Sequence, residues 1–416
     1  MKDCLKERIF SPEFTETLNE DYRFLHAHAE TGFELYETIG YVRKRLEEIG
    51  LSPKACGKCG LVVTLGEHAG GERSGTIPEG MKERGAFLVR ADMDALPIAE
   101  ESGLSYAAKN GNMHACGHDA HTAILLGVAS VLKQYEKQLR FPVKLMFQPA
   151  EELLAGAKDM LEAGVLSEPE VEKALMLHVM CAVPVETGTL VVSNAGVSAP
   201  AADFYTIEIK GKGCHASMPH LGKDPLTTAA HLLVALEEIK AREIEIGKRA
   251  VLTIGALEGA NAANVIPDKI LLKGSLRAFE EETRELMKKR LQEIAEGMGE
   301  IYHTPTSVEF TSGAPTLKND EKLVALCYEA LKGAQPVLRA QDFPAGNSGG
   351  SEDFAYVSQA VPSVMLALAA GDSREGYEHP LHHPRMKLDL RALPYGVAGI
   401  CRIIASEIIP LYEPRT

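Results

Sequence analysis

The chain has 416 residues, of which 45% are hydrophobic and 25% charged, as in a globular protein long enough for two domains. Its formal net charge of −14 argues against binding to nucleic acid or to an anionic membrane surface. The charged N-terminal segment holds no apolar signal region, and no stretch reaches the roughly 18 apolar residues of a membrane span, so we expect a cytoplasmic protein.

The first predicted element is helical and covers residues 15–50, where apolar side chains recur at helical spacing until Gly50. Cys56 and Cys59 follow with the spacing of half a zinc ribbon or of a redox pair. No second such pair accompanies them, so we interpret them as incidental to a turn. The eight cysteines of the chain are too scattered for a disulfide framework, which indicates a reducing compartment.

Short apolar strands then alternate with helices. Strands are predicted at residues 61–65, 86–89, 143–147, 174–177 and 363–368, with a polar, Gly-rich loop over 66–85. Helices are predicted near residues 119–138, 153–163, 319–332 and 391–407. This alternation predicts an α/β fold, in which a mostly parallel sheet carries helices on both faces.

The middle of the chain has a different pattern. Its predicted elements are a strand at 204–210, a helix at 225–241, strands at 251–256 and 269–276, a helix at 281–297 and a strand at 307–311. The order β-α-β-β-α-β is that of a ferredoxin-like α+β domain. We therefore predict a discontinuous α/β domain made of residues 1–199 and 313–416, with a ferredoxin-like domain of residues 200–312 inserted into it.

Reactive side chains gather where the predicted strands of the α/β domain end. Cys116 and His118, two residues apart just before a helix, can both face one soft or borderline cation. Ligands of open α/β sheets bind beyond the carboxyl ends of the strands. The other candidates that follow such ends are Asp92, Asp94, Glu151, Glu152, His178, His379, His382 and His383. Their convergence on one rim of the sheet predicts a metal site.

Two adjacent carboxylates follow one of these strands. Because successive residues of an extended chain point to different sides, Glu152 can bind metal while Glu151 accepts a proton from water, or the reverse. The alternative is a solvated turn or helix N-terminus, which also favours acidic residues, and the other candidates nearby argue against it. Asp94 shares a strand face with Asp92 and is suited to orienting a ligand imidazole.

Motifs along the chain resemble those of the dinuclear metallopeptidase family that includes aminoacylase and glutamate carboxypeptidase. The branch that they resemble most is that of hippurate hydrolase and the plant indole-acetyl-amino-acid hydrolases, which are N-acyl-L-amino-acid amidohydrolases. From about Leu25 to Leu393 the matching segments are, in unbroken order, Arg90–Pro97, Met113–His121, Gln148–Glu152, Gly211–His220, Asn264–Asp268, Ser351–Phe354 and Pro380–Pro384.

The resemblance implies a catalytic domain with two divalent metal ions, which could be zinc, manganese, nickel or cobalt. The implied ligands are Cys116, His118, Glu152, His178 and His382, with Cys116 between the two ions. Glu151 becomes the general base and later the proton donor to the leaving amine, and Asp94 keeps its orienting role. On the residues alone His382 and His383 are equivalent, and only the resemblance selects His382.

The resemblance also assigns roles in the inserted domain. His215 would stabilise the developing oxyanion, in its own or a partner subunit's active site, although the residues alone also fit a locally hydrogen-bonded loop histidine. Asn264 and Arg277 match positions that bind the substrate carboxylate, for which Arg is well suited. Because a ferredoxin-like sheet offers an exposed edge and an outer helix, we expect residues 200–312 to act as a lid and to join a homodimer.

The expected activity is metal-dependent hydrolysis of the amide bond of N-acyl amino acids, with acetyl, benzoyl or similar acyl groups, to a carboxylate and an amino acid. The alternatives are a dipeptidase or carboxypeptidase with the same metal site and a non-catalytic metal- or peptide-binding protein. Glu151 argues against the last, because binding alone needs no second carboxylate beside the ligands. Leu153, Leu154 and Cys214 stand where the branch usually has glycine, so the acyl group and the amino acid stay open.

Overall fold

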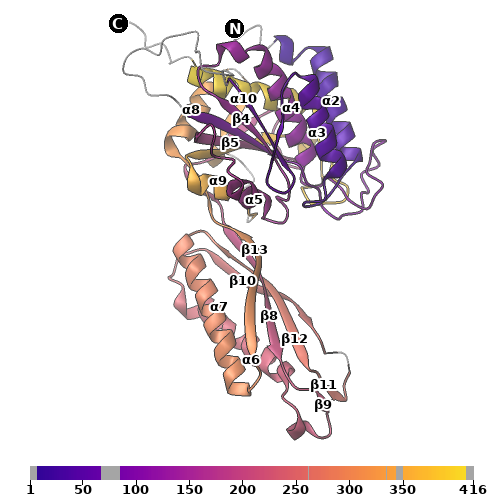
Figure 1. The fold of residues 1–416 in the computed structure, drawn as a ribbon, viewed down its shortest axis with the longest axis vertical. Coiled ribbons are helices and arrows are strands. Elements are labelled where there is room, and N and C mark those ends of the chain that lie inside the picture. Colours follow the sequence, from indigo (N-terminus) through magenta and orange to yellow (C-terminus); the bar gives the residue numbers. More distant parts are fainter. Residues whose placement is uncertain (1–6, 67–84, 261, 334, 343–349, 409–416) are drawn as a thin grey trace. The chain divides into compact units, whose positions relative to one another are not determined.

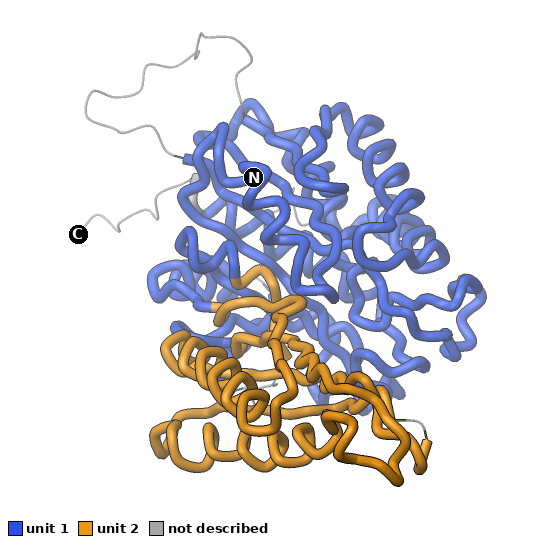
Figure 2. Tube along the Cα trace, turned by 60° about the horizontal axis from the view of Figure 1, so that its bottom comes forward, with its two compact units in different colours: residues 1–198, 318–347, 356–416 blue, residues 199–317, 348–355 orange. Residues whose placement is uncertain are grey.

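The structure is a computed structural model that describes residues 7–66, 85–260, 262–333, 335–342 and 350–408. The chain divides into two compact units (Figures 1 and 2). Unit 1 holds residues 1–198, 318–347 and 356–416, and unit 2 holds residues 199–317 and 348–355. Most of the loop predicted over residues 66–85 lies outside the described residues.

Unit 1 is built on a mixed sheet that has eight strands among the described residues, in the order β1-β2-β4-β3-β5-β16-β6-β15. The strands are β1 (Lys54–Cys56), β2 (Gly60–Leu65), β3 (Ala86–Asp92), β4 (Val143–Gln148), β5 (Val171–Met180), β6 (Leu190–Val192), β15 (Val337–Arg339) and β16 (Ser363–Ala369). The four central strands, β4, β3, β5 and β16, run parallel. Every residue of β3 and β4 is buried, as expected for strands covered on both faces.

Helices flank this sheet, which confirms the predicted α/β class. They are α2 (Pro12–Ala27), α3 (Tyr36–Glu48), α4 (His118–Gln134), α5 (Gly156–Glu162), α8 (Glu321–Leu331), α9 (Ala355–Ala360) and α10 (Leu393–Ile408). The nearly all-buried α4 packs against α2, α3 and α10, whereas α5 contacts β4 (Figure 1). A side chain at Gly127 of α4 would lie 2.6 Å from Leu18 Cδ2 and 2.8 Å from Val397 Cγ2, so only glycine permits this close helix packing. No helix among the described residues is both long and apolar enough to cross a bilayer.

The prediction of one helix over residues 15–50 was wrong, because the chain leaves the helix between α2 and α3. In this interval Thr31 forms an isolated parallel β-bridge with Ala95. The Ala95 amide donates a hydrogen bond to the carbonyl of Glu30 at 2.7 Å. The Glu30 carboxylate then accepts from the amide of Thr38 at 2.9 Å at the start of α3. Gly32, at φ 58°, was the sequence signal for this break, and its carbonyl accepts from the amide of Ala150 at 3.1 Å.

A buried charged cluster joins the end of α2 to the start of α4. His26 Nδ1 lies 2.7 Å from Asp119 Oδ2, and His26 Nε2 lies 3.0 Å from Glu100 Oε1. Burial alone would lower the pKa of His26, but the hydrogen bonds to Asp119 and Glu100 raise it to about 9. His26 is therefore a buried imidazolium near neutral pH, held between two carboxylates.

This cluster predicts a fall in stability as the pH rises. The pKa of His26 is higher in the folded chain than its unfolded value of about 6.5, so its contribution is complete below that pH and is lost between about 6.5 and 9. Over this interval the free energy of unfolding should fall by at most about 3 kcal/mol. Denaturant unfolding at a series of pH values measures the fall, and a His26→Gln variant should show a flatter profile. Identical pH profiles for the two proteins would contradict this assignment.

Unit 2 has the predicted ferredoxin-like fold. Its main strands are β8 (Ala201–Lys210), β10 (Ala250–Glu258), β12 (Lys269–Ala278) and β13 (Thr306–Ala314), and its helices are α6 (Pro225–Glu238) and α7 (Glu281–Tyr302). The sheet order is β10-β12-β8-β13 with every neighbour antiparallel. Helices α6 and α7 cover one face of this sheet, where Ile207, Leu272 and Leu291 belong to a common core (Figure 1).

Two short two-stranded sheets accompany the larger sheets in the described part of the chain. A ribbon of β9 (Cys214–His215) and β11 (Val265–Ile266) lies within unit 2, and β7 (Gly196–Ala199) and β14 (Leu317–Asn319) lie where the chain passes between the units. Cys56 and Cys59 lie on either side of the turn that joins β1 to β2, and their thiols donate to separate carbonyls, those of Met160 and Phe33.

Candidate metal centre

The carboxyl-terminal edge of the parallel strands brings the candidate ligands of unit 1 together. Cys116 and His118 lie at the N-terminus of α4, His178 lies in β5, and Glu152 and His382 follow β4 and β16. Between the first two, Gly117 adopts φ 82°, and a side chain there would lie 2.3 Å from Val179 Cγ2. Glycine at this position therefore lets α4 begin directly against β5.

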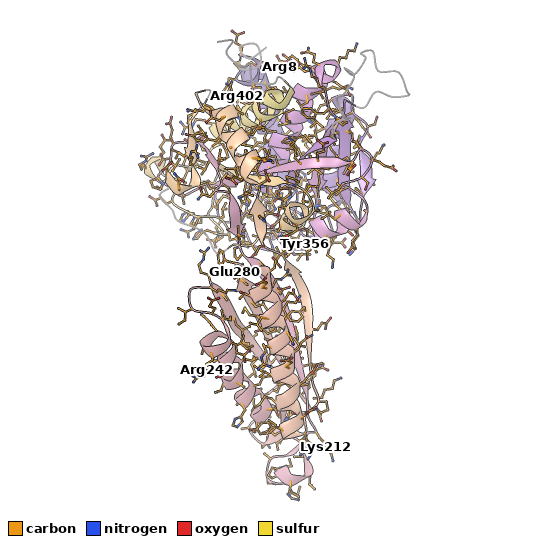
Figure 3. The ribbon with its side chains drawn as sticks, turned by 90° about the vertical axis from the view of Figure 1, so that its left-hand side faces the viewer. Arg8, Lys212, Arg242, Glu280, Tyr356 and Arg402 are labelled. Carbon is orange, nitrogen blue, oxygen red and sulfur yellow. The ribbon has the colours of Figure 1, made fainter. Side chains whose placement is uncertain are left out.

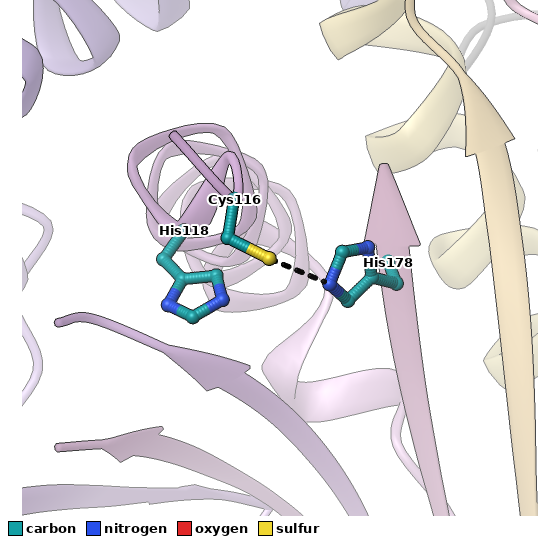
Figure 4. Close-up of side chains that lie close together, drawn as sticks. All are labelled: Cys116, His118 and His178. Atoms are coloured by element: carbon teal, nitrogen blue, oxygen red, sulfur yellow. Dashed lines mark hydrogen bonds between the residues drawn. The ribbon is translucent and has the colours of Figure 1, made fainter. Parts of the chain in front are cut away.

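Five side chains form two groups that share Cys116. Figure 4 shows Cys116 and His118 facing His178, with Cys116 Sγ 3.6 Å from His178 Nε2. Cys116 Sγ also lies 3.3 Å from His382 Nε2, which is 3.5 Å from Glu152 Oε1. Within each group, Cys116–His118–His178 and Cys116–Glu152–His382, the possible ligand atoms lie within 4.8 Å of one another. The thiol therefore stands between two sites that could each hold a cation.

The donor atoms fit divalent metal ions. His118 Nε2 and Glu152 Oε1 are buried, and neither has a hydrogen-bond partner among the described residues. Burying such atoms unsatisfied is unfavourable unless a ligand takes their lone pairs. Sulfur, imidazole nitrogen and carboxylate oxygen at these distances are the ligand types of zinc and of related transition metals.

Burial disfavours the charged forms of two of these ligands. Burial raises the pKa of the Cys116 thiol well above its ordinary value, and it raises the pKa of Glu152 to about 7. A bound cation acts in the opposite direction and favours the thiolate and the carboxylate. A cation bound here would therefore offset the effect of burial on the two groups.

Asp94 supports three of the site residues at once. Its carboxylate accepts hydrogen bonds from the amides of Glu151 and Glu152 at 3.0 and 3.1 Å. Its carbonyl oxygen accepts a hydrogen bond from His118 Nδ1–H at 2.8 Å, which keeps the proton on Nδ1 and leaves Nε2 to face the site. Glu151 itself is buried, and its Oε2 lies 3.9 Å from His118 Nε2.

A second buried network surrounds Asp92 and includes Arg90 and His121, to which the sequence patterns assigned no role. Asp92 accepts from Arg90 Nη1 at 2.7 Å and lies 2.5 Å from His121 Nδ1, while its Oδ2 is 3.5 Å from His118 Nε2. Burial raises the pKa of Asp92, but Arg90, His118 and His121 hold it well below the usual range. The amide of Val179 donates to His121 Nε2 at 2.8 Å. The three-residue spacing of His118 and His121 on α4 was the signal available in the sequence.

Two histidines of the predicted rim belong to neither ligand group. The rings of His379 and His383 stack with centroids 4.3 Å apart, and His383 Nδ1 accepts from the amide of Arg385 at 3.0 Å. His382, one residue before His383, has φ 65°, in the left-handed region. With this backbone conformation the His382 ring lies beside Cys116, whereas the adjacent His383 ring stacks on His379.

The other predicted site residues belong to unit 2. His215 in β9 is exposed, and its Nδ1 accepts from the amide of Ser217 at 3.1 Å, which leaves Nε2 as the donor of the neutral ring. The carbonyl of Asn264 accepts from the amide of Ala216 at 3.0 Å, and Asn264 directly precedes Val265, the β11 residue that pairs with His215. Lys212, labelled in Figure 3, marks the loop that leads into this ribbon. Arg277 in β12 donates to Ser351 Oγ at 2.8 Å.

A thiol, imidazoles and carboxylates at the carboxyl edge of an α/β sheet, with a buried glutamate beside the ligands, define a metal-dependent amide-bond hydrolase. Residues 88–406 match peptidase family M20/M25/M40. The chain belongs to this family, which confirms the resemblance seen in the motifs.

Several relatives align over most of the chain. It is 37% identical over 374 residues to the N-acetyl-L-cysteine deacetylase of Bacillus subtilis (strain 168), covering 89% of this chain and 83% of that protein. It is 33% identical over 410 residues to the IAA-amino acid hydrolase ILR1-like 2 of Arabidopsis thaliana, covering 95% and 86%. The crystal structure of the Bacillus subtilis YXEP protein, described as a dinuclear metal binding peptidase, is similar with a TM-score of 0.74 and 28% identity, covering 96% and 99%.

Proposed function

We propose that the protein hydrolyses the amide bond of N-acyl amino acids and releases a carboxylate and a free amino acid. The observation that carries the proposal is the sharing of Cys116 by two groups of ligands, which suits a pair of divalent ions. Relatives named for N-acetylcysteine and for IAA-amino acids support this substrate class, and the dinuclear YXEP protein supports two ions. Zinc, manganese, nickel and cobalt all suit such ligands.

Glu151 is the proposed general base. Bound divalent cations supply an electrophile for the amide carbonyl and make a water molecule more acidic. The Glu151 carboxylate takes the proton of the attacking water and later returns it to the nitrogen of the leaving amino acid. Glu151 is buried, and its backbone amide donates a hydrogen bond to the Asp94 carboxylate. Both features hold the Glu151 carboxylate beside the candidate ligands.

Colorimetric detection of amine release tests the proposal. The metal-loaded protein should release amino acid from N-acetyl or N-benzoyl amino acids faster than it cleaves unblocked dipeptides. Faster cleavage of dipeptides would instead favour a dipeptidase or carboxypeptidase with the same site. Binding without any turnover would favour a non-catalytic metal- or peptide-binding protein.

Residues of unit 2 complete the proposed function. We assign to Asn264 and Arg277 the binding of the substrate carboxylate, and to His215 the stabilisation of the oxyanion. The donor state of His215 Nε2 supports its role, because an oxyanion needs a hydrogen-bond donor.

Arg277→Ala should raise KM strongly for N-acyl amino acids, because a charge-assisted contact with the carboxylate is lost. The corresponding amino-acid amides lack that carboxylate, so they should already be poor substrates and should lose little more. Steady-state kinetics on matched acids and amides measures the difference, and thermal unfolding shows whether the variant is stable. An equal loss on acids and amides would mean that Arg277 has a structural role, such as its hydrogen bond to Ser351.

We also propose a homodimer joined through residues 200–312, in a cytoplasmic setting. Large apolar side chains are exposed on unit 2, among them Val234 at 74% and Ile301 at 67%, and these favour a protein contact. Light scattering of the intact protein tests the dimer. None of the seven cysteines in the described part of the chain forms a disulfide, which supports a reducing compartment.

A further inference from the structure

The turn that carries the paired glutamates has an unusual backbone. The amide of Leu154 donates to the carbonyl of Glu151 at 2.7 Å, so Glu152 and Leu153 occupy the middle of a tight turn. Ala150 before the turn has φ 53°, and Leu154 at its end has φ 51°. Both values lie in the left-handed region, which is unfavourable for a residue with a side chain and most of all for a bulky one.

Packing and hydrogen bonds hold this strained turn in place. The side chains of Ala150 and Leu154 are buried, and the amides of Ala155 and Gly156 both donate to the carbonyl of Ala150, at 3.2 and 3.1 Å. Asp94 binds the amides of the two glutamates from one side, and the carbonyl of Gly32 accepts from the Ala150 amide. A conformation fixed from several directions is typical of a functional site and leaves the middle of the turn little freedom.

Leu153 is the apolar side chain that this turn presents to solvent. Its exposed fraction is 50%, whereas that of Glu151 is 6% and that of Leu154 is 8%. A Cβ atom on Gly32 would lie 2.8 Å from Leu153 Cδ1, so the inner side of the leucine rests on the Gly32 backbone. Single exposed leucines are common on protein surfaces. This one differs because its backbone is fixed and because it adjoins a candidate metal ligand.

We propose that Leu153 is a specificity-determining residue that forms an apolar wall for the acyl group of the substrate. The inference rests on the proposed function and adds that large apolar acyl groups, such as benzoyl or a medium-length alkanoyl chain, are preferred to acetyl. The acyl group is attached to the carbonyl carbon that is attacked, so it lies beside the candidate metal ligands. Leu153 directly follows one of these ligands, Glu152, in the same turn and in the same unit.

The experiment compares kcat/KM for N-acetyl-, N-hexanoyl- and N-benzoyl-alanine with the full-length, metal-loaded protein. In Leu153→Ala the ratio of the benzoyl to the acetyl value should fall about tenfold, since a contact of a few methylene groups discriminates by this order. Leu153→Met, which keeps the apolar volume, should restore most of the ratio. Ile246→Ala, which removes a fully exposed apolar side chain elsewhere, should leave the ratio unchanged.

The outcomes separate this inference from the proposed function. A wild-type protein that cleaves N-acyl alanines, combined with the same ratio in Leu153→Ala, would overturn the role of Leu153 alone. A shift in preference among amino-acid side chains at constant acyl group would also overturn it, because Leu153 would then contact the other half of the substrate. A wild-type protein that cleaves none of the three substrates would overturn the proposed function and this inference with it.

Discussion

Glu151→Gln is expected to lower kcat by roughly two to four orders of magnitude, which is the usual effect of losing a general base. Glutamine keeps the size of the side chain and its hydrogen-bonding capacity but cannot accept the proton of the attacking water. The amide of residue 151 would still donate to Asp94, so the turn and the neighbouring ligands should keep their positions. Metal content measured by elemental analysis should stay near that of the wild-type protein.

Glu152→Gln is the matched control, because it makes the same chemical change one residue further along. Glu152 Oε1 is buried and lies 3.5 Å from His382 Nε2 within one of the two ligand groups. Replacing this carboxylate by a neutral amide should lower the metal content as well as the rate. If both variants lose metal equally, or if both keep it, the division of roles between the two glutamates is wrong.

Removal of metal is expected to abolish hydrolysis altogether. Treatment with a chelator should leave no turnover, and added divalent ions should restore it with a stoichiometry near two per chain. Cys116→Ser should lower that stoichiometry, because the thiol belongs to both groups and a neutral hydroxyl is a far poorer ligand than a thiolate. Cys56→Ser, which changes a half-buried thiol of the β1–β2 hairpin, should leave the metal content unchanged. Full activity in thoroughly metal-free protein would contradict the two-metal proposal.

The parts of the fold that the sequence predicted are those with a strong local pattern. The largely apolar strands β3 and β4 are buried on both faces, and the alternating strands of unit 2 pair in the expected antiparallel order. The short strands β6 and β15 were not predicted, because three residues are too few to show a period. The break between α2 and α3 was missed because helical spacing continues across it, while the contact of Thr31 with Ala95 decides the conformation.

The candidate site shows the same limit. Cys116, His118 and the paired glutamates stand at the ends of regular elements, so their convergence could be inferred from topology. His382 and His383 lie in a loop without periodicity, and spacing alone gives no direction to their side chains. In the structure, the backbone of His382 at φ 65° turns its ring toward Cys116, while His383 stacks on His379. Only the resemblance to a known family separated the two beforehand.

The three contacts of Asp94 have a consequence for how the site can change in evolution. One residue just after β3 fixes the amides of both glutamates and the proton position of His118. Metal affinity and proton transfer are therefore not independent traits of this scaffold, because any change at Asp94 alters both together. Substitutions there should combine non-additively with substitutions at Glu151 or Glu152. Diversification of this protein is accordingly easier through exposed positions that border the centre than through the residues that support it.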